Sequence, residues 1–173
     1  YNLKPLDTQA AIGRAQLRKL PSFIEARKRN WDKLRKGLNK VSHFLEYSLP
    51  THATDWDEIN GFKWDNSGCK SFSSWFGCKI SVKDCSPFTR TDLAQILDEN
   101  KVGNRMLFGG NLIRQPAFVA LKKERPKAFR VAKELVNSDK IMNNTIFLGT
   151  YPGLTNKMIA HEIQVIKEFI AKL

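Results

Sequence analysis

The sequence has no long uncharged apolar run, few acidic residues and only three cysteines. A helix that crosses a bilayer needs about 20 consecutive apolar residues, and charge interrupts every apolar stretch here, so we expect no membrane partner or span. Cys69, Cys78 and Cys85 are an odd set whose spacing fits neither a disulfide framework nor paired zinc ligands. We therefore expect a protein of the reducing cytoplasm.

The sequence also lacks the short motifs of self-contained catalytic sites. It has no Gly-x-Ser-x-Gly, no P-loop and no Gly-x-Gly-x-x-Gly. His43, His52 and His161 fall in unrelated segments without a partner at ligand spacing, so we interpret them as surface or capping residues. The opening from Tyr1 to Pro5 does not resemble a signal peptide. We expect a piece of a longer protein that works with groups supplied from elsewhere.

What the sequence does contain is material for one core and an excess of positive charge. Its 173 residues are 42% apolar, which is enough for a single domain-sized core. Lysine and arginine total 29 against 17 acidic residues, a net charge of +12. Such a surplus implies an anionic partner or a field that attracts anionic substrates. The sign alone leaves both nucleic acid and nucleotide sugar open.

Local patterns predict two helices at the start of the chain. Asp7 can cap a helix that runs to about Leu20 and ends at Pro21, and Ser22 to Glu25 has the spacing of a capping box. The helix that follows has one apolar face, formed by Ile24, Trp31, Leu34, Leu38 and Val41. We interpret its opposite face as mainly solvated, and it consists of Arg27, Lys28, Arg29, Lys33, Arg35 and Lys36.

The remaining segments predict short strands alternating with helices. Residues 52–68 have no period and predict a long loop, in which the aspartates lack the spacing of a calcium site. We expect strands at 76–82, with Cys78 inward, at 102–108 and at 145–151. We expect a helix that starts at Pro87 and Thr89, with Asp92 three residues after Thr89, and runs to about Asn100. A second starts at Pro126, with Phe129, Ala132 and Leu135 on one face. A third is capped by Thr155, and its apolar face consists of Ile159, Ile163, Ile166 and Ile170. This order indicates a small α/β or α+β domain with helices on a short sheet.

Two stretches are specific enough to suggest a family. They are YNLKPLDTQAAIG at residues 1–13 and NRMLFGGNLIRQP at residues 104–116. With Trp75-Phe76-Gly77, Pro87-Phe88-Thr89-Arg90 and Asn143-Asn144-Thr145, they resemble the carboxyl-terminal part of the DegT-type sugar aminotransferases. Within that family the sequence is most similar to the CDP-4-keto-6-deoxyglucose 3-dehydrases of lipopolysaccharide biosynthesis.

The resemblance implies the small carboxyl-terminal domain of a fold-type I pyridoxal-phosphate enzyme. Residues 1–43 would be helices that lead from a missing large domain, and residues 44–173 would be the small α/β domain. The family places an Asn at the position of Asn2 against the cofactor phosphate of the neighbouring subunit. An amide donor near a helix start suits that role. The catalytic Lys or His of the family would precede Tyr1, so we expect no catalytic residue here.

The loop in the second stretch is our candidate for substrate contact. Gly109 and Gly110 would let the backbone approach a ligand closely, while Arg105, Asn111 and Arg114 offer donors suited to diphosphate and sugar hydroxyls. The alternative is a strand end whose polar residues bond to the chain itself, and both interpretations stay open at this point.

The resemblance implies a pyridoxamine or pyridoxal 5′-phosphate cofactor, a nucleotide-sugar substrate and a homodimer. It leaves open a [2Fe–2S] cluster in the full-length protein, not ligated by this chain, and a flavin or iron–sulfur reductase as partner. We expect a 3-dehydrase that is inactive as this isolated fragment. The alternatives are a sugar-nucleotide aminotransferase and, less favoured, a basic nucleic-acid-binding module.

Overall fold

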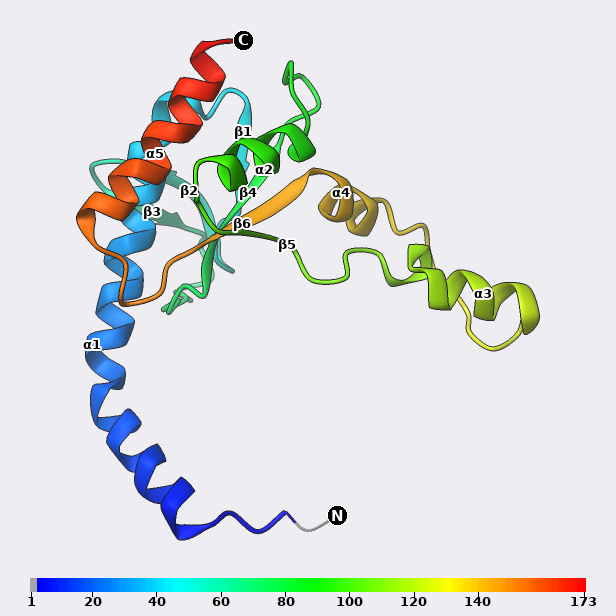
Figure 1. Ribbon diagram of the computed structural model, residues 1–173, viewed down its shortest axis with the longest axis horizontal. Helices are drawn as coiled ribbons and strands as arrows, with labels where there is room; N and C mark the ends of the chain where they lie inside the picture. Colours follow the sequence, from blue (N-terminus) through cyan, green and yellow to red (C-terminus); the bar gives the residue numbers. More distant parts are fainter. Residues whose placement is uncertain (1–2) are drawn as a thin grey trace.

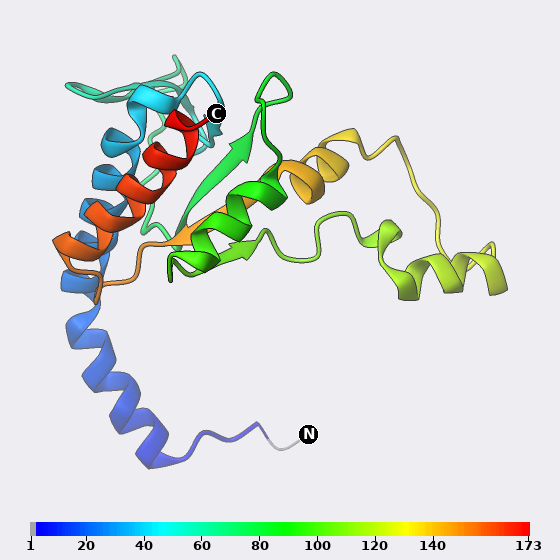
Figure 2. The same cartoon turned by 45° about the horizontal axis from the view of Figure 1, so that its top comes forward.

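The computed structural model describes residues 3–173 and places a packed domain between two projections (Figure 1). One projection is the start of helix α1 (Asp7–Gly37), and the other carries helix α3 (Pro116–Glu124). Both lie on the same side of the domain, so the chain has the outline of an open C (Figures 1 and 2). No helix among residues 3–173 has the length and apolar character to cross a membrane.

Helix α1 is continuous over 31 residues, and the predicted break at Pro21 is wrong. Proline removes one backbone donor and bends a helix without necessarily ending it when strong helix formers lie on both sides. The Ser22 hydroxyl donates to the Lys19 carbonyl at 2.7 Å instead of capping a new helix. The start also differs, because Leu6 is the N-cap and Asp7 lies in the first turn, where a carboxylate is favoured by the helix dipole.

A four-stranded antiparallel sheet forms the centre of the domain. Its order is β1 (Leu45–Tyr47), β4 (Gly77–Val82), β6 (Thr145–Gly149) and β5 (Asn104–Met106). β4 and β6 pair over five residues, with Cys78 opposite Leu148 and Ile80 opposite Ile146. These four side chains are fully buried, which confirms the predicted strand and the inward position of Cys78.

Helices α2 (Arg90–Glu99) and α5 (Asn156–Ala171) join the second half of α1 in the core. Thr89 and Asp92 form the predicted capping box of α2, and Thr155 caps α5 by accepting from the Met158 amide. The apolar face predicted for α5 is confirmed by the buried Ile159, Ile166 and Ile170. The short 3-10 helices are η1 (Asn39–Val41) and η2 (Leu112–Arg114).

The segment predicted as a long loop contains an antiparallel hairpin of β2 (Ala53–Asp57) and β3 (Gly61–Trp64). The Asp57 carboxylate accepts from the Ile59 and Asn60 amides, and Gly61 supplies the positive φ of 74° that the turn needs. Only Trp56 of this hairpin is buried, so no alternation of apolar residues marked it in the sequence.

The helix predicted to start at Pro126 is also wrong. Helix α3 ends at Glu124, residues 125–135 form turns and irregular backbone, and the next helix is α4 (Val136–Asn144). A residue that precedes proline is disfavoured in the helical region, so Pro126 ends α3 rather than opening a helix. Phe129 folds back to make an edge contact with Phe118 at 5.7 Å between ring centroids. The predicted boundary at residue 43 concerns a longer protein and stays a prediction.

Candidate functional site

The loop between β5 and α3, which includes η2, contains two of the three predicted substrate-binding residues, and Asp139 of α4 holds them together. Asn111 Nδ2 donates to Asp139 Oδ1 at 2.8 Å. Arg114 makes a two-pronged contact with the same carboxylate, at 3.2 Å from Nε and 3.0 Å from Nη2. These hydrogen bonds, from Arg114 first and then Asn111, lower the pKa of Asp139. The donors of both residues are therefore directed to the chain itself.

The same loop packs tightly against α4. Asn111 is 1% exposed, and its Oδ1 accepts from the Ile113 amide and so caps η2. Gly110 has a φ of 58°, and a Cβ there would lie 2.6 Å from the Cβ of Met142. Glycine is thus required both by the backbone conformation and by the approach of α4.

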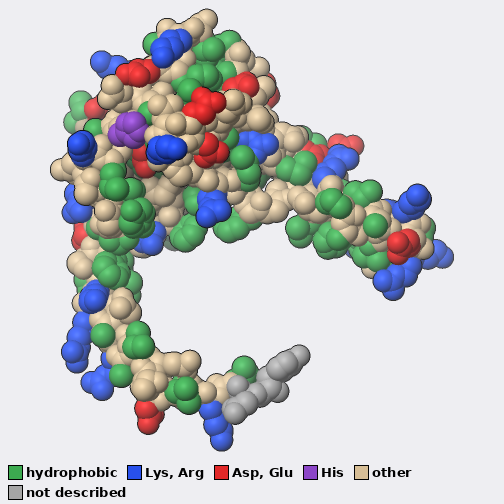
Figure 3. Space-filling model, in the orientation of Figure 1, with side chains coloured by type: hydrophobic (Ala, Val, Ile, Leu, Met, Phe, Trp, Pro, Cys, Tyr) green, Lys and Arg blue, Asp and Glu red, His purple; other side chains and the backbone are tan. Residues whose placement is uncertain are grey.

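Arg105 lies apart from that cluster, exposed on β5 opposite Phe147. The Phe147 ring lies between two exposed rings, Phe76 at 5.8 Å and Phe108 at 6.5 Å between centroids. Phe108 has a φ of 51°, an uncommon conformation for a residue with a side chain. In Figure 3, hydrophobic side chains gather on the side of the domain that faces the space between the projections. Arg105 and Phe108 thus belong to an open surface rather than to an enclosed cavity.

Asn2, the predicted phosphate contact, lies outside the described residues.

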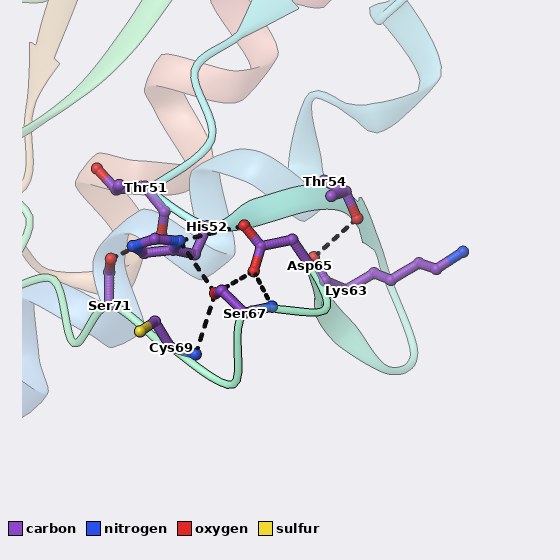
Figure 4. Close-up of polar contacts among 8 residues, drawn as sticks. All are labelled: Thr51, His52, Thr54, Lys63, Asp65, Ser67, Cys69 and Ser71. Carbon is purple, nitrogen blue, oxygen red and sulfur yellow. Dashed lines mark hydrogen bonds and ion pairs between the residues drawn. The ribbon is translucent and has the colours of Figure 1, made fainter.

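His52, Asp65 and Ser67 come together at the base of the hairpin (Figure 4). His52 Nδ1 lies 3.1 Å from Asp65 Oδ2 and 3.3 Å from Ser67 Oγ, and Ser67 also bonds to Asp65. In a catalytic triad the imidazole bridges the two groups through different nitrogens, whereas here both contact the same one. The hydrogen bonds from Ser67, and then from His52, lower the pKa of Asp65. The cluster ties the hairpin to the segment after it and is not a nucleophile site.

The other histidines also have structural surroundings. His161 Nε2 lies 2.9 Å from the Asn100 carbonyl at the end of α2, and His43 contacts the ring of Phe44. This agrees with the predicted capping and surface roles. Residues 3–173 contain no group of three His, Cys, Asp or Glu side chains that could hold a metal ion.

Glu162 is a titratable residue that sequence reasoning missed. It lies on α5 among Ile159 and Ile166, is 8% exposed, and its Oε2 has no hydrogen-bond partner in the described part of the chain. Burial raises its pKa to about 7. The signal was a glutamate at helical spacing within an apolar face. It borders a cavity of about 240 Å³ beside Tyr151 and Met158.

Comparison with known proteins gives concordant results. The family model of the DegT/DnrJ/EryC1/StrS aminotransferase family matches residues 1–167. The lipopolysaccharide biosynthesis protein RfbH of Salmonella typhimurium is 43% identical over 98% of this chain and 33% of its own length. The dTDP-4-dehydro-2,6-dideoxy-D-glucose 3-dehydratase of Saccharopolyspora spinosa is 38% identical over 99% of this chain and 32% of its own. The chain spans about a third of the curated relatives it matches.

A solved enzyme structure also matches nearly the whole of this chain. It is a GDP-4-keto-6-deoxymannose-3-dehydratase with a trapped PLP–glutamate geminal diamine, with a TM-score of 0.70 and 26% identity. The match covers 95% of this chain and 36% of that one. The likeness in fold and sequence therefore extends over nearly all of the present chain but only part of the larger enzyme.

Proposed function

Because this chain belongs to the DegT/DnrJ/EryC1/StrS aminotransferase family, we propose that it forms the small-domain part of a nucleotide-sugar 3-dehydratase. The observation that carries the proposal is the 38% identity, over 99% of the chain, to a 3-dehydratase of a dTDP-sugar. The similarity to a lipopolysaccharide biosynthesis protein supports a role in making a deoxysugar for a surface polysaccharide. A cytoplasmic location is part of the proposal.

The cofactor of the proposed enzyme is pyridoxamine or pyridoxal 5′-phosphate, whose ring acts as an electron sink when bound. Arg105 and Phe108 lie exposed on an open face, so we propose no complete cofactor site on that face. We therefore assign no catalytic step to this chain. We propose Asn2 as a phosphate contact within the assembled enzyme.

The structure refines the proposed substrate-side roles. Arg114 and Asn111 direct their donors to Asp139, so we propose that they shape the loop that approaches the substrate. Arg105 is exposed and lies outside that cluster, so we propose its guanidinium as a substrate contact.

A homodimer is proposed because every described residue before Phe23 is exposed, apolar ones included. The apolar side chains of this arm are Leu3, Leu6, Ile12, Leu17 and Leu20. Several large apolar side chains left exposed on one segment favour an interface there. A flavin or iron–sulfur reductase as partner stays a prediction.

The other hypotheses have less support. We do not extend the proposal to a [2Fe–2S] cluster, which the resemblance left open for the full-length protein and which this chain would not ligate. The basic face of α1, which a nucleic-acid-binding module would use, is largely engaged within the chain. Arg27 donates to two carbonyls, Lys28 and Lys36 pair with acids, and Arg35 lies over two aromatic rings.

The proposal is tested with the natural polypeptide that contains this segment, alongside the 173-residue chain. Each is mixed with pyridoxamine phosphate and CDP-, GDP- or dTDP-linked 4-keto-6-deoxy sugars, and the products are identified by mass spectrometry. We expect loss of the C3 hydroxyl with the natural polypeptide and no turnover with the 173-residue chain. Turnover by the chain alone, or an amino sugar formed from glutamate by the natural polypeptide, would contradict the proposal.

A further inference from the structure

All four tryptophans of the chain line one pocket between α1 and the β2–β3 hairpin. Its volume is about 360 Å³, within the usual range of small-molecule sites. Trp31 comes from α1, Trp56 and Trp64 from the hairpin, and Trp75 from the segment before β4. The hairpin lies beside α1 in Figures 1 and 2.

The rings form an ordered wall. Trp31 stacks on Trp75 with 4.4 Å between centroids and an angle of 10°, and Phe62 lies 5.3 Å from Trp31. Trp56 meets the edge of Trp31 at 6.5 Å and, like Trp31, is buried. This geometry holds the inner rings in fixed positions, so the pocket has a rigid aromatic floor.

The opposite wall is the segment 70–73, and it is held in place. The Ser71 hydroxyl donates to the Thr51 carbonyl at 2.7 Å, and the Cys69 amide donates to Ser67 Oγ (Figure 4). Through Ser67 the segment is joined to His52 and Asp65 at the base of the hairpin. Phe72 nevertheless remains 86% exposed, although it lines the pocket. Phe72 thus presents an uncovered aromatic face at the pocket mouth, on which a flat ligand can stack.

The charges around the pocket favour an anion. Lys28 and Asp32 line it but are paired with Glu25 and Lys36, whereas Lys70 is exposed on the wall beside Phe72. The net charge of +12 adds a general attraction for anions. A flat, aromatic ligand that carries phosphate combines both requirements, because bases stack on aromatic side chains.

We infer that this aromatic pocket binds the base of a nucleoside diphosphate, with Lys70 contacting its phosphate. The choice of a nucleotide among flat anions rests on the proposed function, whose substrate carries a nucleoside diphosphate. The pocket itself is built entirely from residues of this chain, so its binding does not need the cofactor or the rest of the enzyme.

Tryptophan fluorescence tests the inference directly, since every tryptophan lines the pocket. The 173-residue chain, excited at the red edge of tryptophan absorption, is titrated with CDP, GDP or dTDP and corrected for nucleotide absorbance. We expect saturable quenching by at least one nucleotide, weaker binding of the matching nucleoside, and no displacement by equimolar pyrophosphate. Quenching that only rises linearly for all three nucleotides, or full displacement by equimolar pyrophosphate, would overturn the inference.

Variants separate the pocket from general surface effects. Phe72→Ala should weaken nucleotide binding by roughly 10-fold, the scale of one base–aromatic stack, and Lys70→Ala should weaken the nucleotide but not the nucleoside. Ile59→Ala, at the 93% exposed hairpin tip outside the pocket, is the matched control and should change nothing. Unchanged affinity in Phe72→Ala would also overturn the inference. These experiments measure binding and not activity. A negative result would therefore overturn the pocket inference without deciding the outcome of the dehydratase assay.

Discussion

The packed domain and the two projections of this chain differ in whether their apolar side chains are buried. From Trp31 to Val102 and again from Ile146 to Ile170, apolar side chains from helices and strands share one core. Residues 3–22 have no buried member, and neither does the segment 112–135, although both contain apolar side chains. The domain is thus stabilised by its own contacts, whereas the projections have surfaces that this chain leaves uncovered.

The largest contrast is expected between one core leucine and one arm leucine. Leu148→Ala removes a fully buried side chain from β6 and should lower the free energy of unfolding by about 2–5 kcal/mol. Leu17→Ala, on the exposed arm, should change it by less than about 0.5 kcal/mol. Urea unfolding of the 173-residue chain gives both values. A similar loss in both variants would remove the distinction between domain and arm.

The pH dependence of stability is the next effect, and it belongs to the domain. The pKa of Glu162 is about 7 in the folded state against 4.5 as its ordinary value, so the folded chain binds more protons between those values. The contribution of Glu162 to the free energy of unfolding is therefore fully present below pH 4.5. It is lost as the pH rises through 7, by up to about 3 kcal/mol.

Glu162→Gln keeps the shape and removes the titration. Thermal unfolding measured from pH 4.5 to 8 should show a downward slope in the unmodified chain that is absent in this variant. Glu168→Gln, an exposed position of the same helix, is the control. Parallel profiles for the unmodified chain and Glu162→Gln would contradict the assignment.

Asn30 marks the point where α1 becomes part of the domain. It is buried, and its Nδ2 donates to the Tyr151 carbonyl at 2.9 Å, which joins α1 to the turn before α5. Asn30→Ala should cost about 1–3 kcal/mol because the partner carbonyl loses its donor. Arg29→Ala, on the exposed side of the same turn, should be nearly neutral. Equal effects in chemical denaturation would show that α1 is not anchored here.

The smallest predicted effect concerns the loop next to the α3 projection. Asp139→Ala leaves the buried amide of Asn111 without its acceptor and frees Arg114, at a cost of about 1 kcal/mol. The global loss should be accompanied by faster hydrogen exchange confined to residues 108–115. Lys140→Ala, which breaks only an exposed pair with Glu46, is the matched control. Unchanged exchange of the loop in Asp139→Ala would mean that the carboxylate does not hold it.

Local signals in the sequence predicted the domain better than the projections. Thr89 and Thr155 each cap a helix through residues close by in the sequence, and the isoleucines of α5 recur at helical spacing. These predictions therefore did not depend on distant parts of the chain. Both predictions made from proline were wrong. Pro21 was predicted to end a helix but lies inside α1, and Pro126 was predicted to begin a helix but follows the end of α3. Proline restricts the backbone at both positions, and only the context decides what results.

The candidate sites needed contacts that a single sequence does not reveal. Asn111 and Arg114 were predicted from their loop, but Asp139, which holds both, lies 25 residues beyond Arg114. The aromatic pocket draws rings from α1, the hairpin and the segment before β4, and the hairpin itself was missed. Family resemblance supplied the expected chemistry, while the structure supplied the neighbours of each side chain.

The central claim is that the exposed arm of α1 becomes covered when the chain is part of the proposed enzyme. Hydrogen–deuterium exchange of residues 7–22 tests it most directly, compared between the 173-residue chain and the purified natural polypeptide that contains it. The account predicts rapid exchange in the chain alone and slowing of at least roughly 100-fold in the natural polypeptide, as expected when an exposed helix becomes part of a stable interface. Equally rapid exchange in both would contradict it.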